Sequence, residues 1–212
     1  DTAEMYADGG AERIVAQAVA GQRDKVFIAT KVLPSNASYA GTIRACEASL
    51  KRLKIDYVDL YLLHWWSNQH PIAETMRAME ELVRRGLTRF IGVSNLDVGE
   101  MKAAQAALTR ERLACNQVLY HLKGRAIEKA TLPYCEQQDI AVVGYTPLAK
   151  GGFLRGVVAD IAKRHGRTPR QVALNFLTRR ASLFTIPKAS RPEHVRENAG
   201  AIDFTLTAQA LR

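Results

Sequence analysis

The chain has 212 residues and a formal net charge of +9, with 47% hydrophobic and 24% charged residues. This composition is ordinary for a globular protein and excludes a disordered or collagen-like chain. The positive charge attracts any anion, but the basic residues are spread along expected helices without interleaved aromatic residues, which disfavours nucleic-acid binding.

The three cysteines, Cys46, Cys115 and Cys135, lie far apart, with no Cys-x-x-Cys or Cys/His spacing. This pattern supports neither a disulfide framework nor a zinc site, so we expect no metal and a reducing, cytoplasmic location. No apolar run approaches the roughly 18 residues of a membrane-spanning helix, and no charged-then-apolar leader opens the chain. We therefore expect a soluble protein with no membrane partner.

Short apolar runs rich in β-branched residues recur along the chain, as is typical of buried strands. They cover residues 26–32, 58–63, 90–93, 114–119, 140–145 and 183–186. Between them, apolar residues three and four positions apart predict amphipathic helices, as in residues 43–53 and 76–83. Residues 159–164 predict another helix, and Thr207 is a candidate cap for a helix that starts at Ala208.

Strands and helices alternate with a period of about 25 to 30 residues, which predicts right-handed βαβ units around a parallel sheet. An open doubly wound dinucleotide fold should carry a Gly-x-Gly-x-x-Gly turn after its first strand, and the sequence has none. We therefore expect an α/β fold of the (β/α)8 TIM-barrel kind, as a single domain over residues 1–212. Because the sixth strand is the last clear one and a seventh could only end before Asp1, we also expect the barrel to be incomplete at both ends.

In such a barrel, polar residues at the carboxyl ends of strands carry function. The corresponding positions here hold Lys31, His64, Ser94 with Asn95, Gln117 and Tyr145. A single strand-end lysine is usually a surface residue, and a lone histidine is usually a hydrogen-bonded core group. Only the whole set favours a functional site.

Six short segments follow one another along the chain: Asp1-Thr2-Ala3-x-x-Tyr6, Thr30-Lys31-Val32, Leu62-Leu63-His64-Trp65, Gly92-Val93-Ser94-Asn95, Asn116-Gln117 and Ile186-Pro187-Lys188. Their order and spacing resemble the aldo-keto reductase family over nearly the whole chain. Within that family, residues 1–12 and 116–122 look most like the bacterial methylglyoxal reductase subgroup. The resemblance implies an oxidoreductase that reduces aldehydes and ketones with a nicotinamide cofactor, with small dicarbonyls such as methylglyoxal as candidate substrates.

Carbonyl reduction by hydride needs a proton donor for the developing alkoxide, and a tyrosine can serve once its pKa falls below the usual value of about 10. The resemblance implies that Tyr6 is this acid, that Lys31 lowers its pKa, and that Asp1 is the counterion of Lys31. It also implies that His64 hydrogen-bonds the substrate carbonyl and that Trp65 lines the substrate pocket.

The same resemblance implies contacts to the cofactor. Ser94, Asn95 and Gln117 would hydrogen-bond the nicotinamide carboxamide, and the ring would stack on Tyr145. Residues 146–152 correspond to the loop beside the pyrophosphate, and residues 188–198 to the segment that grips the adenosine 2′-phosphate and the adenine. The remaining candidate contacts are Thr146, Leu148, Lys188, Ala189, Ser190, His194, Glu197 and Asn198.

Two positions depart from the family's pattern. Ala189 stands where many members have serine, and His194 stands where many have the arginine that stacks on adenine and pairs with the phosphate. Histidine is largely neutral near pH 7, so this change loses phosphate affinity, and Ser190, Arg191 and Arg196 are the candidates to compensate. We expect a preference for NADPH with NADH tolerated.

The same fold also serves as a nucleotide-binding regulatory or sensor subunit, so a protein with little or no turnover is the alternative. The intact set of Asp1, Tyr6, Lys31 and His64 argues against it, because a sensor needs only the cofactor contacts. A third hypothesis is an unrelated phosphate-binding barrel. We expect a monomer that acts on a small carbonyl compound.

Overall fold

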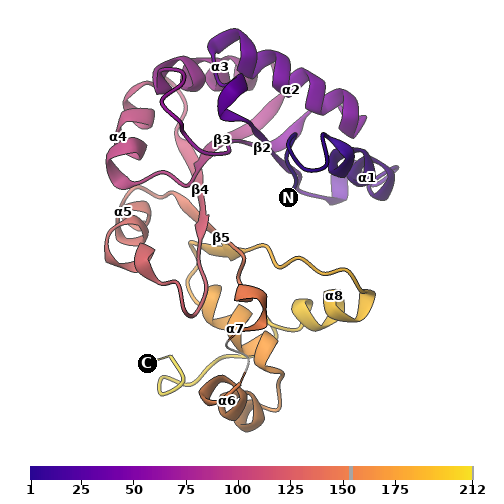
Figure 1. Cartoon of the computed structure of the whole chain (residues 1–212), viewed down its shortest axis with the longest axis vertical. Helices are drawn as coiled ribbons and strands as arrows, with labels where there is room; N and C mark the ends of the chain where they lie inside the picture. Colours follow the sequence, from indigo (N-terminus) through magenta and orange to yellow (C-terminus); the bar gives the residue numbers. More distant parts are fainter. Residues whose placement is uncertain (153–154, 212) are drawn as a thin grey trace. The chain divides into compact units, whose positions relative to one another are not determined.

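The computed structural model describes residues 1–152 and 155–211, except for the side chain of Lys150. The chain divides into two compact units, Asp1–Asn116 and Gln117–Arg212. Figure 1 shows the first unit in indigo to pink and the second from pink through orange to yellow. Each unit contains its own parallel strands and its own covering helices.

The first unit alternates strands with helices along the chain. Its strands are β1 (Ala29–Val32), β2 (Val58–Leu63), β3 (Thr88–Ser94) and the first half of β4 (Leu113–Leu119). Its α-helices are α1 (Gly10–Ala18), α2 (Tyr39–Leu53), α3 (Ile72–Arg84) and α4 (Val98–Ala106). Two short 3-10 turns, η1 (Arg23–Lys25) and η2 (Pro34–Asn36), flank β1.

Strands β1, β2 and β3 are parallel and neighbours in chain order. Lys31 pairs with Leu62, and Leu62 pairs with Gly92, so the three strands end at nearly the same level. Because Lys31, His64 and Ser94 stand at or just beyond these ends, the register brings them to one edge of the sheet. These three residues therefore lie at the strand ends where the sequence indicated them, and their functional role stays a prediction.

The core of the first unit lies between its strands and helices α2 and α3, which lie on the same side of β2 and β3 (Figure 1). All six residues of β2 are buried, as expected for a parallel strand covered on both faces. Ser38 caps the start of α2: its hydroxyl accepts a hydrogen bond from the Gly41 amide (3.1 Å). This cap satisfies one of the free amides at the start of the helix.

A buried carboxylate joins three elements of the first unit. Glu12 on α1 is fully buried and accepts a hydrogen bond from the Thr30 hydroxyl on β1 (2.6 Å). Its other oxygen pairs with Arg52 on α2 (2.5 Å). Because a buried carboxylate needs partners to offset its lost hydration, these contacts attach α1 to the sheet.

The second unit contains the second half of β4, followed by β5 (Ala141–Tyr145) and β6 (Leu183–Thr185). Strands β5 and β6 are parallel, with Val142 opposite Leu183. The α-helices of this unit are α5 (Thr131–Gln137), α6 (Val157–His165), α7 (Pro169–Leu177) and α8 (Pro192–Ala199). Its 3-10 turns are η3 (Ala126–Lys129) and η4 (Ala149–Gly151).

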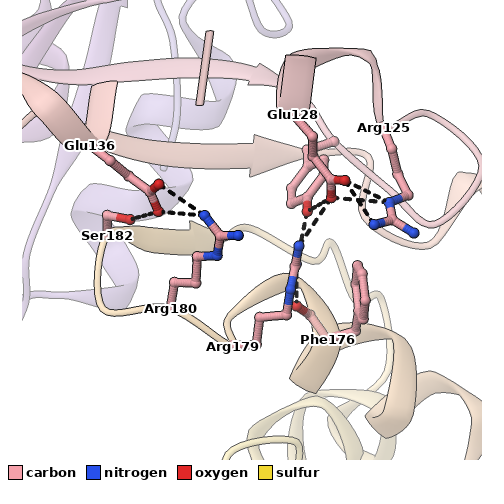
Figure 2. Close-up of polar contacts among 8 residues, drawn as sticks. Arg125, Glu128, Glu136, Phe176, Arg179, Arg180 and Ser182 are labelled. Carbon is pink, nitrogen blue, oxygen red and sulfur yellow. Dashed lines mark hydrogen bonds and ion pairs between the residues drawn. The ribbon is translucent and has the colours of Figure 1, made fainter. Parts of the chain in front are cut away.

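Glu128 is the centre of a polar network in the second unit (Figure 2). Its carboxylate accepts a hydrogen bond from the Tyr120 hydroxyl (2.5 Å) and pairs with Arg125 (2.7 Å) and Arg179 (3.0 Å). Both guanidinium groups also lie over the ring of Phe176, at 5.0 and 3.9 Å from its centroid. A second cluster in Figure 2 consists of Glu136, Arg180 and Ser182. Both clusters link the segment between β4 and β5 to the chain around the end of α7.

The predicted strands are all present: β2 has the predicted bounds, and the other five differ from the prediction at one or both ends. The strand expected from residue 26 starts at Ala29, because residues 23–25 form a 3-10 turn first. The helix predicted after Thr207 is wrong for the described residues: 208–211 form a turn, although the Thr207 hydroxyl does accept a hydrogen bond from the Ala210 amide (3.3 Å). None of the helices in residues 1–152 and 155–211 has the length and hydrophobicity needed to cross a bilayer.

Candidate active site

Lys31 is the buried centre of the candidate site in the first unit. Strand β1 holds its side chain fully buried. The ammonium donates hydrogen bonds to Oδ1 of Asp1 (2.7 Å) and to the carbonyl oxygen of Thr2 (2.8 Å). Burial lowers the pKa of Lys31 to about 8, so the group is still protonated at pH 7.

Tyr6 lies beside Lys31, on a turn. The Tyr6 amide closes this turn by donating a hydrogen bond to the Ala3 carbonyl oxygen (3.1 Å). The Lys31 ammonium is 5.2 Å from the centroid of the Tyr6 ring. The tyrosine side chain is 39% exposed. A phenol that solvent can reach, next to a buried ammonium, is suited to proton transfer.

His64 follows β2 directly in the chain, and its ring contacts the ring of Tyr6 in a T-shaped arrangement. The two ring centroids are 5.7 Å apart with an interplanar angle of 80°. The His64 amide donates to the Val32 carbonyl (3.0 Å), which holds the backbone, and its Nδ1 is buried with no hydrogen-bond partner in the described structure. Burial, and then the charge of Lys31, lower the pKa of His64 to about 4. The imidazole is therefore neutral at pH 7 and can donate one hydrogen bond.

The end of β3 adds two polar side chains. Asn95 Nδ2 donates to Ser94 Oγ (3.1 Å) and to the His64 carbonyl oxygen (3.2 Å). Asn95 has a φ of 60°, a left-handed conformation that asparagine tolerates. Trp65 stacks edge-on against His64 at 4.9 Å and is 36% exposed. The predicted residues of the first unit thus form one group, the Tyr6 cluster: Asp1, Tyr6, Lys31, His64, Trp65, Ser94 and Asn95.

The other predicted residues lie in the second unit. Gln117 is buried on β4, and Tyr145 ends β5. The next residue, Thr146, has a φ of 54°, and Ala149 has a φ of 41°. A β-branched residue in the left-handed region is a strained conformation, and such strain often marks a binding or catalytic site.

A cavity of about 470 Å³, which we call the loop cavity, adjoins this strained segment. Its described lining residues are Thr146, Pro147, Leu148, Ala149, Gly151, Arg170, Ile186, Pro187 and Lys188. Three of the predicted contacts therefore meet here, namely Thr146, Leu148 and Lys188. Arg170 was not predicted, although the pattern Thr168-Pro169-x-Gln171 indicates a helix start at that position.

A second cavity of about 420 Å³ lies where α8 begins. Its lining residues are Ala189, Ser190, Arg191, Pro192, Val195 and Arg196. The predicted residues Ala189 and Ser190 are among them, as are the two arginines expected to compensate for His194. His194 itself lies on α8 and does not line this cavity.

The last two predicted contacts stand at the end of α8. Glu197 pairs with Arg170 at 3.6 Å. The Oδ1 atom of Asn198 is buried and has no hydrogen-bond partner in the described residues. A buried acceptor without a donor costs free energy unless a ligand supplies one. The two cavities, which are lined by Arg170, Lys188, Arg191 and Arg196, suit an anionic ligand.

Comparisons with known proteins identify the family. The model of the aldo/keto reductase family matches residues 1–212. The methylglyoxal reductase YeaE of Escherichia coli is 46% identical over the whole chain, which spans 76% of that protein. The glyoxal reductase of Bacillus subtilis is 33% identical over 99% of the chain and 74% of its own length.

Among solved structures, an aldo-keto reductase from Klebsiella pneumoniae in complex with NADPH matches with a TM-score of 0.94 and 46% identity. The match covers the whole of this chain and 76% of that one. The parallel strands with crossover helices and the Tyr6 cluster thus define an α/β oxidoreductase of the TIM-barrel class. The chain belongs to the aldo/keto reductase family.

Proposed function

We propose that this aldo/keto reductase reduces aldehydes and ketones to alcohols with NADPH, and that small dicarbonyls such as methylglyoxal are among its substrates. The carrying observation is the contact of Tyr6 with both the neutral His64 and the Lys31–Asp1 ion pair. The names of the similar enzymes from E. coli and B. subtilis support the substrate class. The NADPH complex of the Klebsiella protein supports the cofactor.

NADPH, when bound, supplies the hydride that the carbonyl carbon receives. Tyr6 gives its hydroxyl proton to the carbonyl oxygen, and the charge of Lys31 stabilises the phenolate that remains. His64 donates a hydrogen bond to the same oxygen, which orients the substrate and stabilises the developing charge. Asp1 holds the Lys31 ammonium in place and offsets its burial.

The cofactor contacts follow from the same assignment. The amide and hydroxyl groups of Ser94, Asn95 and Gln117 suit a carboxamide, and the face of Tyr145 suits the nicotinamide ring. The phosphate-bearing part is assigned to Thr146, Leu148, Lys188, Ala189 and Ser190. The adenine is assigned to His194, Glu197 and Asn198, where the unpartnered Asn198 Oδ1 can accept from the adenine amino group.

Oxidation of NADPH in the presence of methylglyoxal or 4-nitrobenzaldehyde tests this function. We expect turnover by the wild type, and a loss in kcat of about 10²- to 10⁴-fold in Tyr6→Phe, because only the acid is removed. The affinity for NADPH should not change. Tyr39→Phe, which alters an exposed tyrosine on α2, is the matched control.

Two results would contradict the proposal. Full activity of Tyr6→Phe would remove Tyr6 as the acid. Tight NADPH binding by the wild type without oxidation of any carbonyl compound would instead indicate the sensor subunit.

The cytoplasmic location and the monomeric state are part of the proposal. All three cysteines are buried thiols outside any disulfide, as suits a reducing compartment. Size-exclusion chromatography with light scattering measures the oligomeric state, and a mass of two or more chains would contradict a monomer.

A further inference from the structure

One cation of the loop cavity has no role in the function proposed above. Arg170 is the second residue of α7, whose start is held by a reciprocal pair of hydrogen bonds. The Thr168 hydroxyl accepts from the Gln171 amide (3.2 Å), and the Gln171 side chain accepts from the Thr168 amide (3.1 Å). This capping box fixes the backbone from which Arg170 reaches the cavity.

The charges around the loop cavity are all of one sign among its described lining residues. Arg170 and Lys188 are cations, and no carboxylate is present in this lining. Lys188 makes no ion pair with any residue that the structure describes. The carboxylate partner of Arg170, Glu197, is not among these lining residues, so the cavity presents two cations to a ligand and is suited to an anionic group.

The existing partner of Arg170 is weakly held. Its Nε atom is 3.6 Å from Oε2 of Glu197, and the two side chains are 28% and 25% exposed. A single long contact of this kind contributes little free energy, whereas a guanidinium can bind a phosphate through two parallel hydrogen bonds. If Arg170 left Glu197 for a phosphate, α8 need not move, because the Gln171 side chain separately donates a hydrogen bond to the Glu197 carbonyl oxygen (3.1 Å).

We propose that Arg170 binds a phosphate group of the dinucleotide together with Lys188, and that it leaves Glu197 when it does so. This inference rests on the proposed function. Arg170 would then replace the arginine that the sequence lacks at position 194. It would do so from α7 and through the loop cavity, not from α8. It also frees the Glu197 carboxylate to accept a hydrogen bond from the adenine amino group.

Titration calorimetry of the full chain with NADPH and with NADH tests the inference. We expect Arg170→Ala to weaken binding by about tenfold to a hundredfold, since it removes a charge-assisted pair of hydrogen bonds. Arg170→Lys should lose less, because it keeps the charge without the planar fork. Arg180→Ala is the matched control: it removes the same charge from an arginine paired with Glu136 outside both cavities, and should bind as the wild type does.

The two cofactors distinguish the phosphates. Weaker binding of NADPH alone assigns Arg170 to the 2′-phosphate, and equal weakening of NADPH and NADH assigns it to the pyrophosphate; both results support the inference. Unchanged binding of both by a folded Arg170→Ala, or by Arg170→Lys where the alanine variant does not fold, would overturn it. A wild type that binds neither cofactor would instead refute the proposed function.

Discussion

Burial acts in the same direction on the two ionisable groups beside Tyr6. It lowers the pKa of Lys31 to about 8 and that of His64 to about 4. At pH 7 the Tyr6 cluster therefore contains an ammonium and a neutral imidazole. The ammonium can stabilise a phenolate while the imidazole donates to the substrate without adding a second charge.

These two pKa values predict the pH dependence of catalysis. We expect kcat/KM to be constant between about pH 5 and pH 7 and to fall on both sides. Below pH 5 His64 takes up a proton next to Lys31, and above pH 8 Lys31 loses the proton that stabilises the phenolate. A pH series at saturating NADPH measures the profile. An alkaline limb near the usual lysine value of about 10 would contradict the role given to burial.

Lys188 should determine part of the choice between cofactors. In Lys188→Ala we expect kcat/KM to fall more for NADPH than for NADH, by about tenfold, because a charged partner of the 2′-phosphate is lost. Steady-state kinetics with both cofactors gives the ratio. Lys163→Ala, at an exposed position on α6, controls for the loss of one positive charge. A ratio that does not change would exclude Lys188 from the 2′-phosphate site.

Lys31, His64, Ser94 and Asn95 could be predicted to lie together, because the ends of neighbouring parallel strands meet at one edge of the sheet. Asp1, Tyr6 and Trp65 were indicated only by the resemblance to the family. The sequence could not show that Arg170 lines the loop cavity, because that cavity depends on how α7 packs against the segment after β5. The low pKa of His64 was equally beyond the sequence. It follows from burial and from a lysine 33 positions away in the chain.

At the scale of elements, Glu80 connects α3 to the segment between α4 and β4. Its carboxylate accepts hydrogen bonds from the amides of Thr109 (2.9 Å), Arg110 (2.6 Å) and Glu111 (3.0 Å), and from the Thr109 hydroxyl (2.9 Å). Burial alone would raise the pKa of Glu80, but these hydrogen bonds lower it to about 2. The folded state therefore stabilises the charged carboxylate of Glu80 relative to the neutral carboxyl group.

Glu80→Gln should destabilise the protein by about 1 kcal/mol at pH 7, because the amide presents a single, uncharged acceptor to four donors. A folded pKa below the unfolded value contributes stability above about pH 4.5, and this contribution is lost as the pH falls towards 2. Urea unfolding at several pH values measures the difference, which should vanish at about pH 2. Glu193→Gln is the control, since its single exposed ion pair with Arg191 contributes little. Equal losses in both variants would contradict the special role of Glu80.

The strands and most helices could be predicted because their apolar spacing reflects burial directly. The turn at residues 208–211 could not be predicted from the sequence. A capping threonine permits a helix, but a short helix is stable only when it packs an apolar face against the protein. The sequence pattern also predicted the start of β1 too early, at residue 26 instead of Ala29. Val26 has the apolar side chain of a strand residue, but its carbonyl accepts from the Arg23 guanidinium (2.9 Å) instead of joining the sheet.

At the scale of the whole molecule, the net charge of +9 bears on how fast the cofactor arrives. A positive protein attracts a polyanion over a distance set by the Debye length, which falls from about 30 Å to about 3 Å between 0.01 M and 1 M salt. The carbonyl substrates are neutral, so the field does not act on their approach.

We therefore expect the association rate constant for NADPH to fall steeply with ionic strength, and that for NADH to fall less, because NADH lacks the 2′-phosphate. Stopped-flow measurement of cofactor binding over this salt range gives both slopes. Lys163→Ala should lower the NADPH association rate slightly, through the net charge, and leave the dissociation rate unchanged. Lys188→Ala should also raise the dissociation rate, because it removes a contact in the complex. Identical salt slopes for NADPH and NADH would show that the field of the whole chain does not act on the 2′-phosphate, and the preference for NADPH would then have to arise from contacts alone.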